Sequence, residues 1–138
     1  MRRRIIVADD EAYVTTILAS KLRQAGHEVV TVSNGQAAFE FAVQNAPDLI
    51  ITDYQMPVLS GYEMSVKLRQ DPRTAGVSLI MLTARGHHLS EEQLAATNIR
   101  HLVAKPFSAK DVLAKVNKLL GDAIVDGSRA PSGEMSRS

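Results

Sequence analysis

Side chains that could carry phosphoryl or metal chemistry come at or just after the ends of four short apolar runs. They are three carboxylates, one hydroxyl and one ammonium: Asp9, Asp10, Asp53, Thr83 and Lys105. Carboxylates that lie close together repel one another and raise each other's pKa, and a hard divalent cation such as Mg²⁺ relieves that repulsion. One carboxylate can then attack a phosphoryl group as a nucleophile. The cation and the ammonium would offset the charge of that group.

Each of these residues also has an ordinary structural explanation. An Asp after a strand often caps the next helix, and Asp10 followed by Glu11 suits the positive end of a helix. Thr83 alone would be a turn or capping residue, and Lys105 alone would be a solvated surface charge. Their joint occurrence at successive strand ends favours a shared site. In that site, the Thr83 hydroxyl and the backbone N–H of Ala84 would hold a phosphoryl oxygen.

Five short apolar runs must position these side chains. They cover residues 5–8, 29–32, 49–51, 79–82 and 102–104. Each has the length of a strand, and unbroken runs are typical of parallel strands that are covered on both faces. Apolar residues at helical spacing lie between the runs, so strand and helix alternate five times. We therefore predict an α/β fold with a five-stranded parallel sheet, in which ligands bind at the carboxyl ends of the strands.

Helix starts are predicted by three pairs of residues with the spacing of a capping box. The pairs are Ser33 with Gln36, Ser60 with Glu63, and Ser90 with Gln93. The fourth helix, near residues 90–97, is predicted to be weak because it is short and has few residues that could enter a core.

Length and composition exclude several other classes of protein. The chain has 138 residues, of which 45% are hydrophobic, with 16 basic and 15 acidic residues and no cysteine. One domain fits this length, and the charge balance gives no electrostatic case for nucleic acid as the main partner. The lack of cysteine excludes a disulfide framework and a thiolate metal site. We expect one domain over residues 1–121, a flexible tail or linker over 122–138, and a cytoplasmic location.

With these residues assembled, the chain resembles the receiver domain of bacterial two-component response regulators over residues 4–120. The resemblance is carried by the Asp9–Asp10 pair, segments 51–57 and 81–84, Gly61, and segment 105–107. It implies a three-layer α/β/α fold with the flavodoxin-like strand order 2-1-3-4-5.

The resemblance also implies a role for each carboxylate. Asp53 would accept a phosphoryl group from a histidine kinase, a phosphotransfer protein or a small phosphodonor. Asp10, Asp53 and the backbone carbonyl of Gln55 would bind Mg²⁺ directly, and Asp9 would reach the ion mainly through water. The domain would catalyse its own phosphorylation and a slow dephosphorylation, without being a metabolic enzyme.

Further roles follow from the same resemblance. Lys105 would pair with the phosphoryl group, Thr83 would swing toward it, and the Lys105–Pro106 peptide would be cis. Gln55 and Arg85 would flank the approach of water and tune the lifetime of the phosphorylated form.

Two positions depart from the pattern of the family. Leu102 stands where receivers usually carry a Tyr or Phe, three residues before the lysine, so the usual aromatic route of switching is in doubt. Segment 97–100 replaces the common Gly-Ala-Asp before the last strand, and Asn98 is predicted to take a left-handed turn there.

The leading hypothesis is a phosphorylation-dependent switch that signals through protein–protein contacts, with no direct contact to nucleic acid or membrane. A phosphorylation-linked dimer is compatible with it. One alternative is the receiver part of a larger hybrid kinase or DNA-binding regulator. Another is an interaction module that works without phosphorylation. A flavin-binding protein of the same fold is disfavoured, because the loops after the first and third strands lack a phosphate cradle.

Overall fold

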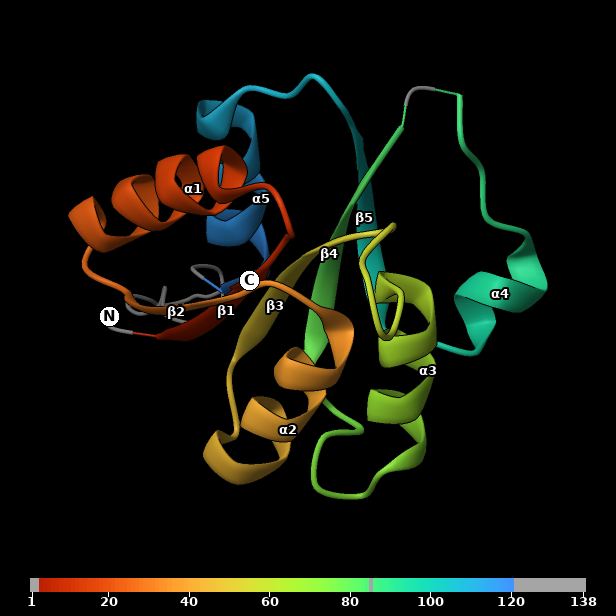
Figure 1. Ribbon diagram of the computed structural model, residues 1–138. Helices are drawn as coiled ribbons and strands as arrows, with labels where there is room; N and C mark the ends of the chain where they lie inside the picture. The colour runs from red at the N-terminus through yellow and green to blue at the C-terminus, as the bar shows by residue number, and fades with distance from the viewer. Residues whose placement is uncertain (1–2, 85, 121–138) are drawn as a thin grey trace, which may run out of the picture.

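The protein folds into a parallel β-sheet with helices on both faces (Figure 1). The computed structural model describes residues 3–84 and 86–120. The elements in chain order are β1 (Arg4–Ala8), α1 (Ala12–Gln24), β2 (Glu28–Val32), α2 (Gly35–Asn45), β3 (Leu49–Asp53), α3 (Gly61–Gln70), β4 (Ser78–Thr83), α4 (Glu91–Ala95), β5 (Ile99–Ala104) and α5 (Ala109–Leu120). The predicted alternation of strand and helix is therefore confirmed.

The order of the strands in the sheet is β2-β1-β3-β4-β5, as predicted. All neighbouring strands are parallel, and the chain crosses over β1 to place β3 beside it. Ala8 pairs with Thr52 and Thr83 pairs with Ala104, so the carboxyl ends of these strands lie at one edge of the sheet. This edge carries the acidic residues that follow β1 and β3.

The core has two layers because side chains on each strand alternate between the two faces of the sheet. On β1, Ile5 and Val7 pack in the cluster that includes α1 and α5, whereas Ile6 and Ala8 pack in the cluster that includes α2 and α3. Figure 1 shows α1 and α5 together on one side of the sheet, with α2 and α3 on the other. Burial on both faces explains why the inner strands are unbroken apolar runs.

Two of the three predicted capping boxes are present. The Ser60 hydroxyl accepts from the N–H of Glu63, whose carboxylate accepts from the N–H of Ser60, and the pair at the start of α4 forms the same reciprocal bonds. The box predicted at Ser33 is wrong. Asn34 caps α2 instead, because its side-chain oxygen accepts from the N–H of Ala37 at 2.8 Å.

The segment before β5 also differs from the prediction. Asn98 does not take the left-handed conformation; its side chain donates to the carbonyl of Ala75 and accepts from Arg69. β5 begins at Ile99, three residues before the predicted start at Leu102. It is an edge strand with buried and exposed positions, and Leu102 is an exposed large hydrophobic residue.

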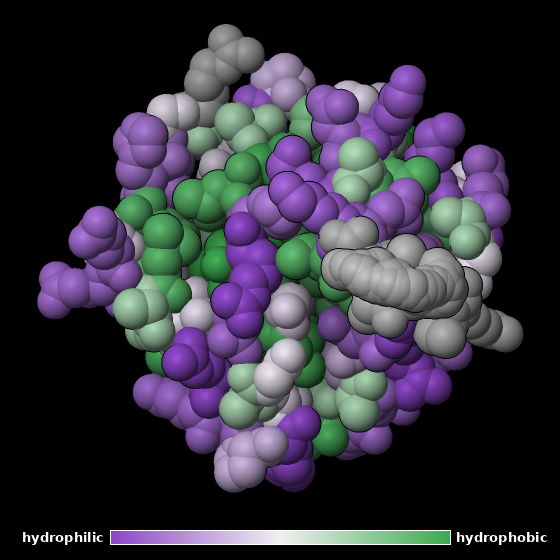
Figure 2. Space-filling view, turned by 180° about the vertical axis from the view of Figure 1, so that it is seen from behind, coloured by the Kyte–Doolittle hydropathy of each residue, from purple (hydrophilic) through white to green (hydrophobic). Residues whose placement is uncertain are grey.

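Seen from behind, the surface shows hydrophobic residues interleaved with polar ones (Figure 2).

None of the helices within residues 3–84 and 86–120 is both long and apolar enough to cross a membrane. The predicted tail, residues 122–138, lies outside the residues that the structure describes.

Candidate functional site

Three carboxylates meet at the carboxyl ends of β1 and β3. Asp9 and Asp10 follow β1, and Asp53 is the last residue of β3. One carboxylate oxygen from each residue lies within 4.8 Å of the corresponding oxygens of the other two. Asp9 and Asp53 are buried and Asp10 is exposed, so the cluster opens to solvent on one side. The structure thus brings together the three carboxylates that the sequence predicts would meet.

The pKa values of the two buried carboxyl groups in the cluster are raised, as expected for carboxylates held close together. Burial raises the pKa of Asp53, the neighbouring Asp9 carboxylate raises it further, and Lys105 partly opposes both. Burial also raises the pKa of Asp9, against the hydrogen bond that Asp9 accepts from the backbone N–H of Glu11. A hard cation held by oxygen ligands would remove this strain, and the donor set fits Mg²⁺.

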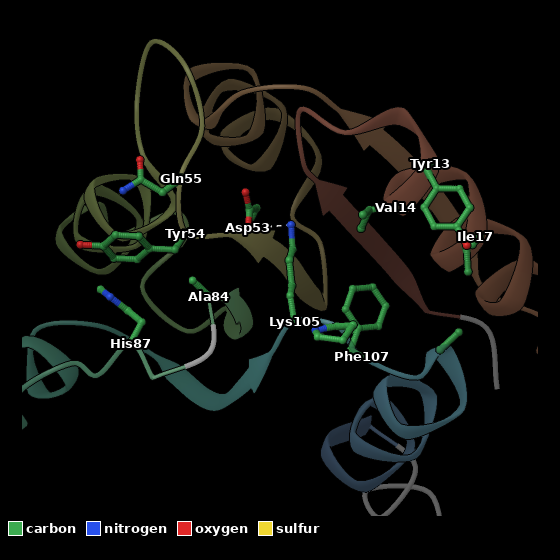
Figure 3. Close-up of a pocket in the computed structure, with 12 residues that line it drawn as sticks. Tyr13, Val14, Ile17, Asp53, Tyr54, Gln55, Ala84, His87, Lys105 and Phe107 are labelled. Atoms are coloured by element: carbon green, nitrogen blue, oxygen red, sulfur yellow. Dashed lines mark ion pairs between the residues drawn. The ribbon is translucent and has the colours of Figure 1, made fainter.

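Lys105 is the cation that faces these carboxylates. Its Nζ lies 3.1 Å from Asp53 Oδ1, 3.2 Å from Asp9 Oδ2 and 2.9 Å from Glu11 Oε1. In Figure 3, Lys105 projects from the end of β5 toward Asp53. Burial alone would lower the pKa of Lys105, but its hydrogen bonds to Glu11 and Asp53 outweigh burial and hold the pKa above its ordinary value.

A backbone hydrogen bond fixes the position of Lys105 at the end of β5. Its N–H donates to the carbonyl of Thr83 at 2.7 Å, which ties the end of β5 to the end of β4. The peptide between Lys105 and Pro106 is cis, as predicted. Thr83 is buried as the last residue of β4, and Ala84 follows it at the surface.

A cavity of about 820 Å³ opens beside Asp53. Five of the predicted site residues line it and share one space: Asp53, Gln55, Ala84, Lys105 and Pro106. Figure 3 shows Tyr54 and His87 on one side of Lys105, and Phe107 on the other with the residues of α1. Arg85, the second predicted tuning residue, lies outside the described residues.

Gly61 holds the loop after Asp53 against the sheet. Its N–H donates to the carbonyl of Tyr54 at 2.9 Å. A Cβ at this position would collide with the backbone carbonyl oxygen of Asp53 and press on the hydroxyl of Thr52. The first turn of α3 therefore packs directly on the backbone of the acidic residue, and only glycine allows that approach.

Sequence reasoning missed two features of the site. It gave Glu11 no part in it, although Glu11 makes the shortest ion pair of Lys105. The only signal was that Glu11 continues an acidic run. It also missed the contact between Tyr54 and His87, whose ring centroids are 4.3 Å apart with an interplanar angle of 49°. That contact depends on how two loops fold back, and no spacing rule reports it.

A protein-family model for the response regulator receiver domain matches residues 5–117. Together with the strand order and the acidic site at the strand ends, this match establishes that the chain belongs to the response regulator receiver domain family.

Curated relatives are longer than this chain. The phosphate regulon transcriptional regulatory protein PhoB of Pseudomonas aeruginosa is 33% identical over 129 residues, which make up 94% of this chain and 56% of that protein. The alkaline phosphatase synthesis transcriptional regulatory protein PhoP of Bacillus subtilis is 33% identical over 135 residues, or 98% of this chain and 54% of that protein. The chain spans about half the length of these relatives.

Solved structures share the fold over nearly their whole length. The receiver domain of a sensor histidine kinase from Pseudomonas aeruginosa, with a magnesium ion coordinated in its active site cleft, gives a TM-score of 0.77 at 26% identity. The match covers 88% of this chain and 99% of that one. The response regulator TrrA of Thermotoga maritima, in complex with Mg²⁺ and a beryllium fluoride, gives a TM-score of 0.75 at 33% identity. This match covers 86% of this chain and 99% of that one.

Proposed function

We propose that this domain accepts a phosphoryl group on Asp53 in a magnesium-dependent reaction and thereby switches its contacts with another protein. The observation that carries the proposal is the arrangement around Asp53. Its carboxylate lies beside two further carboxylates and 3.1 Å from the ammonium of Lys105, at the edge of an open cavity. Membership of the receiver domain family supports the same conclusion.

In the proposed step, a carboxylate oxygen of Asp53 attacks the phosphorus atom of a phosphodonor. A new O–P bond forms, and the bond from phosphorus to the donor's nitrogen or oxygen breaks, with its electron pair leaving on the donor. Lys105 offsets the negative charge on the phosphoryl oxygens. The Thr83 hydroxyl and the Ala84 N–H, at the end of β4, would donate hydrogen bonds to those oxygens.

Asp10, Asp53 and the backbone carbonyl of Gln55 would hold the Mg²⁺ ion, with Asp9 acting through water. When bound, the ion would offset the negative charge of the carboxylates and of the transferred phosphoryl group. Burial raises the pKa of Asp9 and Asp53, and a cation at the cluster would offset the cost of keeping these carboxylates ionised, which supports this assignment.

Loss of the phosphoryl group would follow when a water molecule attacks the phosphorus in line with the Asp53 oxygen. Gln55 lines the same cavity as Asp53, which supports a role for its side chain in admitting or excluding that water. Arg85 is proposed to share this role on the basis of the family resemblance.

The phosphodonor would be a histidine kinase or a phosphotransfer protein, and the output would be binding of a further protein in the cytoplasm. The alternative of a receiver that belongs to a larger DNA-binding regulator is favoured by one specific observation. The curated relatives named above are transcriptional regulatory proteins about twice as long as the matched region.

Incubation with acetyl phosphate and Mg²⁺, followed by intact-mass measurement, tests the proposal. Wild type should gain the mass of one phosphoryl group, and Asp53→Asn should gain none. Chelation of the metal should abolish the gain, and Asp10→Asn should reduce it strongly. Asp111→Asn, which removes an exposed carboxylate on α5, is the matched control and should behave as wild type.

A wild-type protein that takes up no phosphoryl group and shows no response to Mg²⁺ would instead favour an interaction module that works without phosphorylation. Uptake that survives in Asp53→Asn at the wild-type rate would mean that the acceptor has been assigned to the wrong residue.

A further inference from the structure

Glu11 is the most exposed of the three carboxylates that hold Lys105. Its side chain is 62% exposed, whereas those of Asp9 and Asp53 are 0% and 11% exposed. Its contact with the Lys105 Nζ, at 2.9 Å, is nevertheless the shortest of the three. Glu11 follows the acidic pair in sequence and has no place among the proposed metal ligands.

The backbone of Glu11 is held in place from both sides. Its N–H donates to Asp9 Oδ1, and its carbonyl accepts from the N–H groups of Val14 and Thr15 in the first turn of α1. Glu11 is the N-cap residue of α1, but its side chain makes no capping hydrogen bond. The helix therefore does not use this carboxylate, which contacts the Lys105 Nζ instead.

The ammonium of Lys105 has three N–H donors, and three carboxylates already face it. When Asp53 carries a phosphoryl group, the N–H that faced its carboxylate can turn to the new oxygens, but a second N–H reaches them only if Lys105 releases Asp9 or Glu11. Release of Asp9 would take a direct ion pair from a buried carboxylate, which the proposed Mg²⁺ would reach only through water, and that loss is unfavourable. Release of Glu11 exposes that carboxylate to water, which replaces the lost contact at little cost.

We propose that Glu11 is a positioning residue that anchors Lys105 at the outer side of the site and competes with the phosphoryl group for its ammonium. This inference rests on the proposed function, because it assumes that Asp53 carries the phosphoryl group. The resting contact biases the domain toward the unphosphorylated state, and its loss favours the phosphorylated one.

The prediction for Glu11→Gln is tighter binding of a phosphoryl mimic. Beryllofluoride at saturating Mg²⁺ should bind about two- to fivefold more tightly to the variant, which is the effect expected of one exposed ion pair. Removal of a negative charge beside the acidic cluster should weaken Mg²⁺ binding or leave it unchanged. The two affinities should therefore not rise together, whereas a variant that merely loosened the site would bind both probes less tightly.

Glu11→Asp separates contact from charge. It keeps the negative charge but shortens the side chain by one methylene, so that it no longer reaches Lys105. Asp is also a favoured N-cap residue, and its carboxylate would turn to the free N–H groups of α1. We expect Glu11→Asp to bind beryllofluoride as tightly as Glu11→Gln does, while its Mg²⁺ affinity stays at the wild-type value.

The experiment is a calorimetric titration of wild type, Glu11→Gln and Glu11→Asp with Mg²⁺ alone, and then with beryllofluoride at saturating Mg²⁺. Glu92→Gln, which removes an exposed carboxylate on α4, is the control and should match wild type in both titrations. Circular dichroism of each variant verifies that the fold is intact.

Tighter mimic binding in both Glu11 variants supports the competition. Unchanged mimic binding in both variants overturns it, provided that wild type binds the mimic. Tighter binding in Glu11→Gln alone also overturns it, because the effect then comes from charge at a distance and not from the contact. Wild type that binds no beryllofluoride contradicts the proposed function itself, so the two failures are distinguishable.

Discussion

Replacement of Gly61 by alanine should destabilise the domain by about 2 kcal/mol. In a helix, alanine is normally more favourable than glycine by up to about 1 kcal/mol. At this position, the added Cβ would meet the carbonyl oxygen of Asp53, which is backbone and cannot rotate away. Overpacking of this kind typically costs about 1–3 kcal/mol. Displacement of the helix start would also weaken the hydrogen bond from Gly61 to Tyr54, worth about 1 kcal/mol.

Gly76 provides a matched control for this substitution. It lies in the turn before β4, its φ is not in the left-handed region, and a Cβ there would meet no atom within 4 Å. Gly76→Ala should therefore leave the free energy of unfolding unchanged or raise it by about 0.5 kcal/mol through the unfolded state. The measurement is urea denaturation of both variants and wild type, followed by circular dichroism.

Gly61→Ala should thus lower the free energy of unfolding, whereas Gly76→Ala should not. If Gly61→Ala proves as stable as Gly76→Ala, the close packing of α3 on the backbone of Asp53 is not needed, and the reasoning is refuted. A second readout follows phosphoryl uptake from acetyl phosphate. Because the collision pushes directly on Asp53, the folded fraction of Gly61→Ala should also be phosphorylated more slowly than wild type.

Three further predictions concern the fold. Val58 has a φ of 71° and is 80% exposed. Val58→Gly should therefore raise the free energy of unfolding, measured by urea denaturation, by about 1 kcal/mol, because glycine relieves the strain of the left-handed backbone. A variant less stable than wild type would contradict this strain. Asn34→Ala should lower thermal stability by about 1 kcal/mol through loss of the cap of α2, whereas Ser33→Ala should leave it unchanged; equal losses would mean that the cap is shared. Burial lowers the pKa of His27 from its ordinary value of 6.5. The unfolded chain then binds a proton more readily, so the stability from neutral His27 is complete above about pH 6.5 and declines as the pH falls. His27→Gln should flatten the pH dependence of unfolding between about pH 7 and pH 5, and an unchanged curve would contradict the assignment.

Much of the fold could be predicted because the signals were local and repeated. The apolar runs located all five strands, and the residues that follow them located the site at their carboxyl ends. The boxes at Ser60 and Ser90 were right because each pair stood alone. At Ser33 a second capping residue, Asn34, came next in sequence, and spacing alone could not decide between them. β5 was predicted too short because Arg100 and His101 interrupt the apolar run on an edge strand.

The three predicted carboxylates and Lys105 came together, but the network among them was only partly predictable. Sequence order placed Asp9, Asp53 and Lys105 at one end of the sheet. It could not report that Glu11 turns back from the start of α1 to share the same ammonium, because that depends on a backbone turn held by Asp9. Contacts that arise when loops from distant strands meet need coordinates.

The weakness of α4 has a consequence for how the domain opens. This helix has five residues, none of them buried, although it begins with a complete capping box. Its amides should therefore exchange with deuterated solvent through small local openings, while those of β1 and β3 exchange only on global unfolding. The acidic cluster lies on the slowly exchanging side, whereas Thr83 lies on the strand that leads to α4. A phosphoryl group held between them would contact the last residue of the strand that precedes α4, and the protection of α4 amides would report whether that contact orders the helix.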